Sequence, residues 1–240
     1  MKYAILGDIH GNLDALDVVL DCIEKEKVDE IACVGDIVGY AAEPSACVQR
    51  IRDLDCHVVA GNHDYAVLGK TDVSCFNPDA LRSVLWTKEH LSKGDLDWLD
   101  SLPLTVEHED FTLAHGTLHS PEYFDYIQTI YDAQLSFEKL DNRVCFLGHS
   151  HVPVTFFDVN PIIYTLDNHI KLMPGQKALV NVGSVGQPRD QNPLAAYAIY
   201  DAGAEVVRIF RVEYDIDKAA EKIRKAGLPD FNAERLYVGR

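Results

Sequence analysis

Five times in this 240-residue chain, a short apolar run stops at a polar cluster that carries glycine, aspartate or histidine. The clusters are Gly7-Asp8-Ile9-His10-Gly11, Gly35-Asp36, Gly61-Asn62-His63-Asp64, His115-Gly116 and Gly148-His149-Ser150-His151. Short apolar runs rich in β-branched and aromatic residues, ended by glycine or another turn residue, are typical of buried strands. Because the carboxyl ends of neighbouring strands meet at one edge of an open α/β sheet, we expect these clusters to converge in space.

Helical patterns fill the gaps between the apolar runs. Asn12 is a suitable N-cap for a helix whose apolar residues keep helical spacing from Leu13 to Ile23. Four further helices are expected, beginning at Pro44, running from Asn77-Pro78 to about Leu91, and covering Tyr131–Leu140 and Asp215–Ala226. The alternation of strand, loop and helix predicts a layered α/β fold.

The pattern changes after residue 150, where strands follow one another through short connections. The expected strands are Val154–Asp158, Ile162–Leu166, Ala178–Val182, Ala195–Asp201 and Glu205–Arg211. They suggest a second, largely antiparallel sheet packed on the first. The chain contains no linker or low-complexity segment, so we expect residues 1–240 to form a single domain.

Composition narrows the classes of function. A net charge of -16, from 38 acidic and 22 basic residues, disfavours a protein that grips long nucleic acids. A small phosphorylated substrate is still compatible, because bound metal ions can dominate the local field. The sequence has no long apolar stretch for a membrane span, and its first apolar run is too short for a signal peptide. Six cysteines without a C-x-x-C pair favour a reduced, cytoplasmic setting.

The five clusters supply side chains that bind metals. They are Asp8, His10, Asp36, Asn62, His63, His115, His149 and His151. Singly, a histidine after a strand or an aspartate after glycine is more often a capping or turn residue. Their repetition at five strand ends favours a metal centre, with oxygen and nitrogen donors that suit Mn²⁺, Fe, Co²⁺ or Zn²⁺ better than Ca²⁺ or Mg²⁺ alone. Two ions that share a carboxylate would lie about 3.5–4 Å apart.

These clusters, taken with the residues around them, resemble the five sequence blocks of the calcineurin-like metallophosphoesterases, in the family order. The later run Asn181–Asp190, and the segments around Asn77–Thr87 and Gly227–Pro229, are similar to compact prokaryotic members of phosphodiesterase type. The resemblance therefore extends over nearly the whole chain. It implies two packed mixed β-sheets flanked by helices, in four αββα layers.

The resemblance also implies roles for individual residues. It assigns ligands to two ions: Asp8, His10 and His151 to the first, Asn62, His115 and His149 to the second, and Asp36 as a bridge between them. The nucleophile would be a hydroxide between the ions. His63 would stand beside the ions, contact the phosphate and protonate the leaving oxygen.

One departure from the family pattern concerns the residues after Asp36. Phosphoprotein phosphatases of the family carry an Asp-Arg pair where this chain has Gly39 and Tyr40. The carboxylate that would orient His63 and one phosphate-binding arginine are therefore missing. Asp64 is an alternative partner for His63, although adjacent side chains rarely point the same way.

Other residues are candidates for binding the substrate. Arg189 could bind a phosphate or, equally, hold a turn through an ion pair with Asp190. Tyr40 and the aromatic segment Tyr123–Tyr126 could pack against a nucleobase or aryl group, or serve in ordinary loop packing.

The leading hypothesis is a dinuclear metal hydrolase of phosphodiesters or small nucleotide substrates. The same metals would serve a dinucleoside polyphosphate or cyclic nucleotide hydrolase. A phosphomonoesterase like the serine/threonine phosphatases is a further alternative. An interaction scaffold on the same fold is disfavoured, because all seven candidate ligand positions are filled. The sequence does not specify an oligomeric state.

Overall fold

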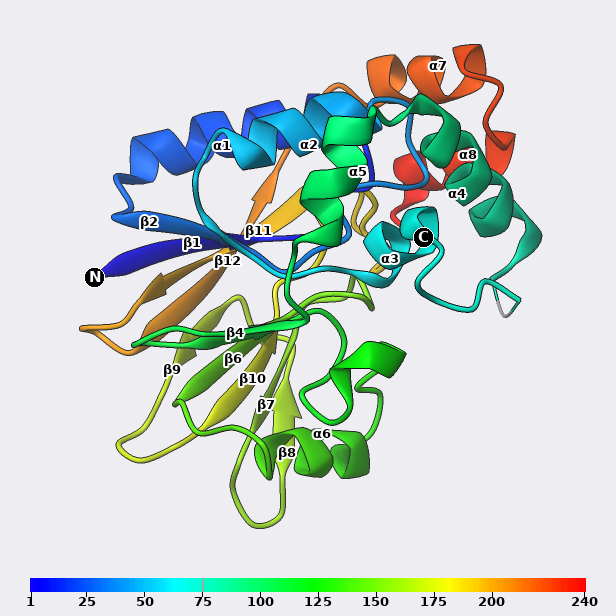
Figure 1. The fold of residues 1–240 in the computed structure, drawn as a ribbon. Helices are drawn as coiled ribbons and strands as arrows, with labels where there is room; N and C mark the ends of the chain where they lie inside the picture. Colours follow the sequence, from blue (N-terminus) through cyan, green and yellow to red (C-terminus); the bar gives the residue numbers. More distant parts are fainter. Residues whose placement is uncertain (75) are drawn as a thin grey trace.

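Two β-sheets pack face to face in the computed structural model, which describes residues 1–74 and 76–240 (Figure 1). The first sheet has the strand order β3 (His57–Val58), β2 (Glu30–Cys33), β1 (Lys2–Leu6), β11 (Ala195–Asp201), β12 (Val206–Val212) and β9 (His169–Lys171). The second has the order β4 (Thr105–Glu107), β5 (Thr112–Ala114), β6 (Val144–Leu147), β10 (Ala178–Asn181), β7 (Val154–Phe157) and β8 (Ile163–Thr165). Both sheets mix parallel and antiparallel pairs.

Helices cover the outer faces of the sheets. They are α1 (Leu13–Glu26), α2 (Pro44–Arg52), α3 (Asn62–Leu68), α4 (Pro78–His90), α5 (Lys93–Asp100), α6 (Ile130–Phe137), α7 (Ile216–Lys225) and α8 (Asp230–Val238), with a short 3-10 turn at Pro121–Tyr123. Asn12 caps α1 as expected, its side chain accepting a hydrogen bond from the Ala15 N–H. Within the described residues, no helix has the length and apolar character to cross a membrane.

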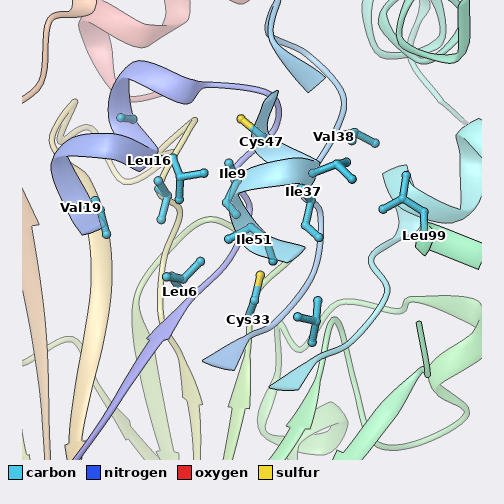
Figure 2. Packing of buried hydrophobic residues seen from close by; sticks show 14 of the residues in the cluster. Leu6, Ile9, Leu16, Val19, Cys33, Ile37, Val38, Cys47, Ile51 and Leu99 are labelled. Atoms are coloured by element: carbon cyan, nitrogen blue, oxygen red, sulfur yellow. The ribbon is translucent and has the colours of Figure 1, made fainter. Parts of the chain in front are cut away.

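Alternate residues of the central strands enter two different cores. Tyr3 and Ile5 of β1 pack between the sheets, whereas Ala4 and Leu6 face the layer of α1 and α2. Figure 2 shows this outer core, with Leu6 among side chains of α1 and α2. A third cluster joins α6 to the outer face of the second sheet. Burial on both faces explains the continuous apolar runs, and the expected four-layer sandwich is confirmed.

The expectation of a separate antiparallel sheet after residue 150 is wrong. Strands β7, β8 and β10 extend the second sheet, whereas β9, β11 and β12 extend the first. β11 pairs antiparallel with β1, and β10 pairs parallel with β6. Buried strands need hydrogen-bonding neighbours on both edges, and these late strands supply them. An apolar pattern specifies a strand but not its partner.

Several elements were not expected from the sequence. They are β4, β9, α3, α5 and α8. The strand expected to continue to Ala60 ends at Val58, because α3 begins directly after Gly61. Of the six cysteines, those in the described residues are free thiols, and Cys75 lies outside the described residues.

Candidate metal centre

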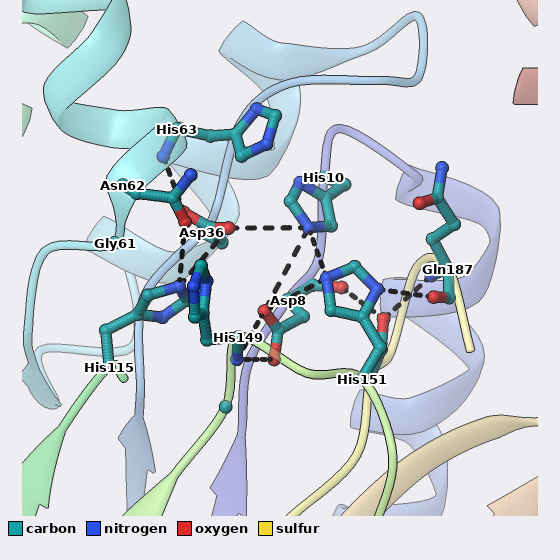
Figure 3. A network of polar contacts seen from close by, with 12 residues as sticks. Asp8, His10, Asp36, Gly61, Asn62, His63, His115, His149, His151 and Gln187 are labelled. Carbon is teal, nitrogen blue, oxygen red and sulfur yellow. Dashed lines mark hydrogen bonds and ion pairs between the residues drawn. The ribbon is translucent and has the colours of Figure 1, made fainter. Parts of the chain in front are cut away.

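The loops that follow β1, β2, β3, β5 and β6 meet at one edge of the sandwich (Figure 3). They bring together all eight candidate side chains named from the sequence: Asp8, His10, Asp36, Asn62, His63, His115, His149 and His151. All are buried except Asn62, which is half-buried. Because water is largely excluded from this cluster, electrostatic interactions within it are stronger than they would be at the surface.

The backbone of these loops is strained at the candidate residues. Asp8, His10 and Asp36 have φ near +50°, and His149 and His151 have φ of 69° and 59°. Non-glycine residues rarely adopt this left-handed conformation, which costs roughly 1–2 kcal/mol each. Interloop hydrogen bonds hold it in place, because the N–H groups of Asp8, Ile9 and His10 donate to carbonyls of residues 35 and 36. Such strain concentrates at functional sites.

Backbone carbonyls fix the orientation of three imidazole rings. The Nδ1–H groups of His10, His115 and His151 donate to the carbonyls of Val38 (3.1 Å), Val34 (2.7 Å) and Gln187 (2.6 Å), respectively. In the neutral form, the Nε2 lone pair of each ring then faces the centre of the cluster. This arrangement of a carbonyl behind a ring is the usual support for a metal-binding histidine.

The inward-facing atoms form two donor groups that share one carboxylate. Asp8, His10, Asp36 and His151 form one group, and Asp36, His115 and His149 form the other; within each, one atom per residue lies within 4.8 Å of the others. The shared Oδ2 of Asp36 is 3.5 Å from His10 Nε2 and 3.3 Å from His115 Nε2.

These contacts show that the residues fit metal ions. His10 Nε2 lies only 3.0 Å from His151 Nε2, and His151 Nε2 lies 3.3 Å from Asp8 Oδ1. Neutral rings oriented by carbonyls present acceptors to one another here, and a cation satisfies such a set where a further acceptor cannot. Asn62 Oδ1 lies 3.2 Å from His115 Nε2 and joins the second group.

Burial and charge set the protonation of the rings. Burial lowers the pKa of His10, His149 and His151 well below the usual value, which favours the neutral form that binds metals. His115 differs: burial lowers its pKa, but the adjacent Asp36 charge outweighs that effect and raises the pKa to about 9. A cation between Asp36 and His115 would therefore compete with a proton.

His63 lies beside the donor groups rather than within them. Its ring is 4.9 Å from that of His10 and 4.5 Å from that of Tyr40, and its backbone N–H donates to Asp36 Oδ1 at 2.8 Å. Burial lowers the pKa of His63 to about 4. The Nδ1 atom is buried and has no hydrogen-bond partner within the described residues.

Asp64 does not orient His63, so this alternative is wrong. Its Oδ1 accepts from the N–H groups of Ile37 (3.0 Å) and Val38 (3.2 Å), and its Oδ2 accepts from Gly61 N–H (2.9 Å). The two carboxylate oxygens thereby join the loop of Asp36 to the loop of Asn62 and His63. As expected for adjacent residues, the two side chains point in different directions.

Packing against Gly39 positions the ring of His63 instead. A Cβ atom added to Gly39 would lie 2.5 Å from His63 Nδ1, so only glycine leaves room for the ring. Gly39 also has φ of 99°, in the region that favours glycine. The sequence identified Gly39 only as a missing carboxylate, and the close contact with a residue 24 positions later has no sequence signal.

A cavity of about 320 Å³ opens above the cluster. Its walls include Asp36, His63, Tyr40, Tyr126 and Arg189. The rings of Tyr126 and His149 stack with centroids 3.9 Å apart, and Tyr40 packs against His10, so both tyrosines support candidate ligands. Tyr123 is 72% exposed at the same cavity and is free to contact a substrate.

Arg189 faces this cavity and does not pair with Asp190. Its Nε and Nη2 atoms donate to Gln187 Oε1 at 3.3 and 2.8 Å, whereas Asp190 forms an ion pair with Arg211. The interpretation of Arg189 as a turn residue paired with its neighbour is therefore wrong. Gln187 was missed as a site residue. Its backbone carbonyl orients His151, and such a contact leaves no mark on residue type.

Comparisons with known proteins agree with this geometry. A family model described as the calcineurin-like phosphoesterase superfamily domain matches residues 1–205. An uncharacterized protein of Methanocaldococcus jannaschii is 43% identical, over 99% of this chain and 98% of its own. The symmetrical bis(5'-nucleosyl)-tetraphosphatase of Vibrio cholerae is 31% identical, but that match covers 51% of this chain and 46% of the relative.

Solved structures show the same fold. A metallophosphoesterase from Sphaerobacter thermophilus superposes with a TM-score of 0.90 at 36% identity, covering 100% of this chain and 99% of the other. A hypothetical protein from Pyrococcus horikoshii gives a TM-score of 0.81 at 21% identity, covering 100% of this chain and 98% of its own.

Proposed function

Because the chain belongs to the calcineurin-like phosphoesterase superfamily, we propose that it is a dinuclear metal phosphodiesterase acting on phosphodiesters or small nucleotides. The observation that carries this proposal is the position of Asp36, whose Oδ2 is shared by two groups of metal-binding atoms. Seven oxygen and nitrogen ligands exceed the needs of one tetrahedral site and suffice for two sites that share a carboxylate.

We assign three ligands to each ion and one to both: Asp8, His10 and His151 to the first, Asn62, His115 and His149 to the second, and Asp36 to both. Bound divalent ions would polarise the phosphate and lower the pKa of a water molecule. Mn²⁺, Fe, Co²⁺ and Zn²⁺ all suit this donor set. The carbonyls behind the three rings would keep the Nε2 atoms aimed at the ions throughout the reaction.

His63 is assigned the proton transfer. In the free protein its pKa of about 4 keeps the ring neutral at pH 7. A phosphate that enters the cavity brings negative charge to the ring, which raises the pKa and favours the protonated form. His63 would then donate a hydrogen bond to the phosphate and pass a proton to the leaving oxygen.

The charges around the cavity favour diesters over phosphoproteins. A phosphomonoester dianion benefits from a clamp of arginines, but Tyr40 occupies the position where the phosphoprotein phosphatases carry one. Arg189 is the arginine among the cavity-lining residues in the described part of the chain. A diester carries one negative charge, which two ions neutralise unaided. The match to the Vibrio tetraphosphatase supports nucleotide anhydrides as a second substrate class.

Relative turnover of three substrates tests this proposal. The kcat/KM values for bis(p-nitrophenyl) phosphate, p-nitrophenyl phosphate and a phosphopeptide are measured in one Mn²⁺ buffer. The diester should be cleaved best, and Asp36→Asn should abolish the activity, which excludes a contaminating phosphatase. Monoester or phosphopeptide turnover tenfold above that of the diester, about 1.4 kcal/mol in transition-state preference, would overturn the assignment.

We further propose that residues 1–240 act as a single domain in the cytoplasm. The core between the sheets supports the first part, since it contains Tyr3 and Ile5 of one sheet and Leu113 and Phe146 of the other. The free cysteines of the described residues support the second.

A further inference from the structure

The C-terminal helix α8 contacts the wall of the cavity, although it lies beyond residues 1–205 matched by the family model. Asn232 on this helix is buried, and its Nδ2 donates to the carbonyl of Tyr40 (3.1 Å) and to Ser83 Oγ of α4 (2.8 Å). An apolar cluster joins α7 and α8 to Ala41. The helix thus holds Tyr40, which has φ of 51°, in its position at the cavity.

The same helix brings a second arginine to Tyr40. The guanidinium carbon of Arg235 lies 5.9 Å from the centre of the Tyr40 ring, and that of Arg189 lies 5.5 Å from the same centre. Arg235 is half-buried and also lies 5.1 Å from the ring of Phe231. The two guanidinium groups therefore approach one ring from two segments far apart in the sequence.

Neither guanidinium is neutralised by a side chain. Within residues 1–74 and 76–240, no side-chain carboxylate lies within ion-pair distance of Arg189 or Arg235. Arg189 donates to Gln187 Oε1, and Arg235 Nε donates to the backbone oxygen of Arg240. Burial, and then the Arg189 charge, lower the pKa of Arg235 to about 10, so the Arg235 guanidinium stays charged at neutral pH. Both arginines lie over the ring of Tyr40, in a chain whose net charge is -16.

We propose that Arg189 and Arg235 form a second anion subsite, which binds a phosphate of the substrate other than the one at the metal centre. The inference rests on the proposed function and narrows its substrate class to nucleotides that carry a chain of at least two phosphates. Arg189 is shared by the cavity and the pair, so the phosphate chain would run from the donor groups past Tyr40 towards α8. The planar fork of arginine suits phosphate oxygens, and an anion between like charges relieves their repulsion.

Binding of two inorganic probes tests the subsite without requiring turnover. The affinity of Mn²⁺-loaded protein for tripolyphosphate and for orthophosphate is measured by calorimetry at one buffered free Mn²⁺ concentration. Arg235→Gln should weaken tripolyphosphate binding at least tenfold and leave orthophosphate binding within twofold. Arg208→Gln, the same change on an exposed residue of β12, should alter neither affinity.

Three results would overturn the subsite. They are unchanged tripolyphosphate binding in Arg235→Gln, equal weakening of both probes, and equal weakening by Arg208→Gln. Arg235→Lys distinguishes the positive charge of residue 235 from its packing in α8. The variant should recover part of the tripolyphosphate affinity, whereas a purely structural role of Arg235 predicts no recovery. Melting temperatures of both Arg235 variants verify folding, and Arg235→Lys serves as the test if Arg235→Gln is unfolded.

Kinetics with a diester separate the two proposals. The KM of bis(p-nitrophenyl) phosphate, which has no second phosphate, should rise in Arg235→Gln by a smaller factor than that by which the tripolyphosphate affinity falls. Absence of diester hydrolysis in the wild-type protein would contradict the proposed function, while the calorimetric comparison would still decide whether the subsite exists.

Discussion

The carboxylate of Asp64 joins the loop of Asp36 to the loop of Asn62 through hydrogen bonds. We therefore expect Asp64→Asn to lower the affinity for both metal ions, although the change removes no proposed ligand. The carboxylate accepts the N–H groups of Ile37 and Val38 on the Asp36 loop through one oxygen. It accepts Gly61 N–H, directly before Asn62, through the other. Asparagine keeps one acceptor oxygen and places an NH₂ group opposite at least one buried N–H donor.

The size of the effect follows from these bonds. A buried donor that loses its acceptor costs about 1–3 kcal/mol. For a domain of this size, each kcal/mol lowers the melting temperature by about 2–4 °C, so we expect a fall of about 2–12 °C. Mutation of a residue that orients a metal ligand typically lowers the affinity for the metal by about 10–100-fold. Because Asp36 belongs to both donor groups, the affinities for both ions should fall together.

Melting curves and competitive Mn²⁺ titration of the same preparations measure the two effects. Asp132→Asn is the matched control, because Asp132 accepts backbone N–H groups at the start of α6 on the surface. The control should lower the melting temperature slightly and leave metal affinity unchanged. The reasoning fails if Asp64→Asn binds both ions as tightly as the wild-type protein, or if the control weakens them equally.

Three further predictions concern the centre itself. Elemental analysis of Mn²⁺-loaded wild-type protein should approach two equivalents, and Asp36→Asn should reduce both sites together; a plateau at one equivalent with full activity would contradict the bridge. His63→Ala should retain two equivalents and slow turnover by roughly 10²–10⁴-fold, with a smaller loss for substrates whose leaving group needs no proton; loss of metal would show that the assigned role is wrong. Gly39→Ala places a Cβ 2.5 Å from His63 Nδ1, so kcat should fall while metal content is kept; wild-type kcat would show that the contact does not position the ring.

The positions of the candidate donors and of every strand except β4 and β9 could be predicted from the sequence, because the strands and the donors have local signals. Cys33 and Cys145 lie in runs buried on both faces, and such runs are apolar without interruption. Each run ends where the chain turns, so the polar residues that follow lie at one edge. Local pattern was sufficient there.

Strand partners and the surroundings of individual side chains could not be read in this way. β1 pairs with β2 on one side and with β11 on the other. Several strands of the chain have a composition similar to that of β11, so the composition alone does not show which of them pairs with β1. The contacts of His63 with Gly39, and of Tyr40 with Asn232, join segments far apart in the sequence. The hydrogen bonds of Asp64 to three backbone N–H groups could not be predicted either, because nearly every residue has a backbone N–H group and the sequence does not show which of them Asp64 contacts.

The pairing of early strands with late ones also decides when the metal centre can form during synthesis. Every candidate ligand lies at or before His151, yet Lys2 of β1 pairs with Asp201, and Val144 of β6 pairs with Ala178. A nascent chain that already contains all the ligands therefore still exposes open edges of β1 and β6, which invite pairing with other chains. Such distant pairings form slowly. We therefore expect the protein to bind metal only after β11 has left the ribosome. A shortened chain that ends before β10 would keep every candidate ligand but would lack the strands that position them.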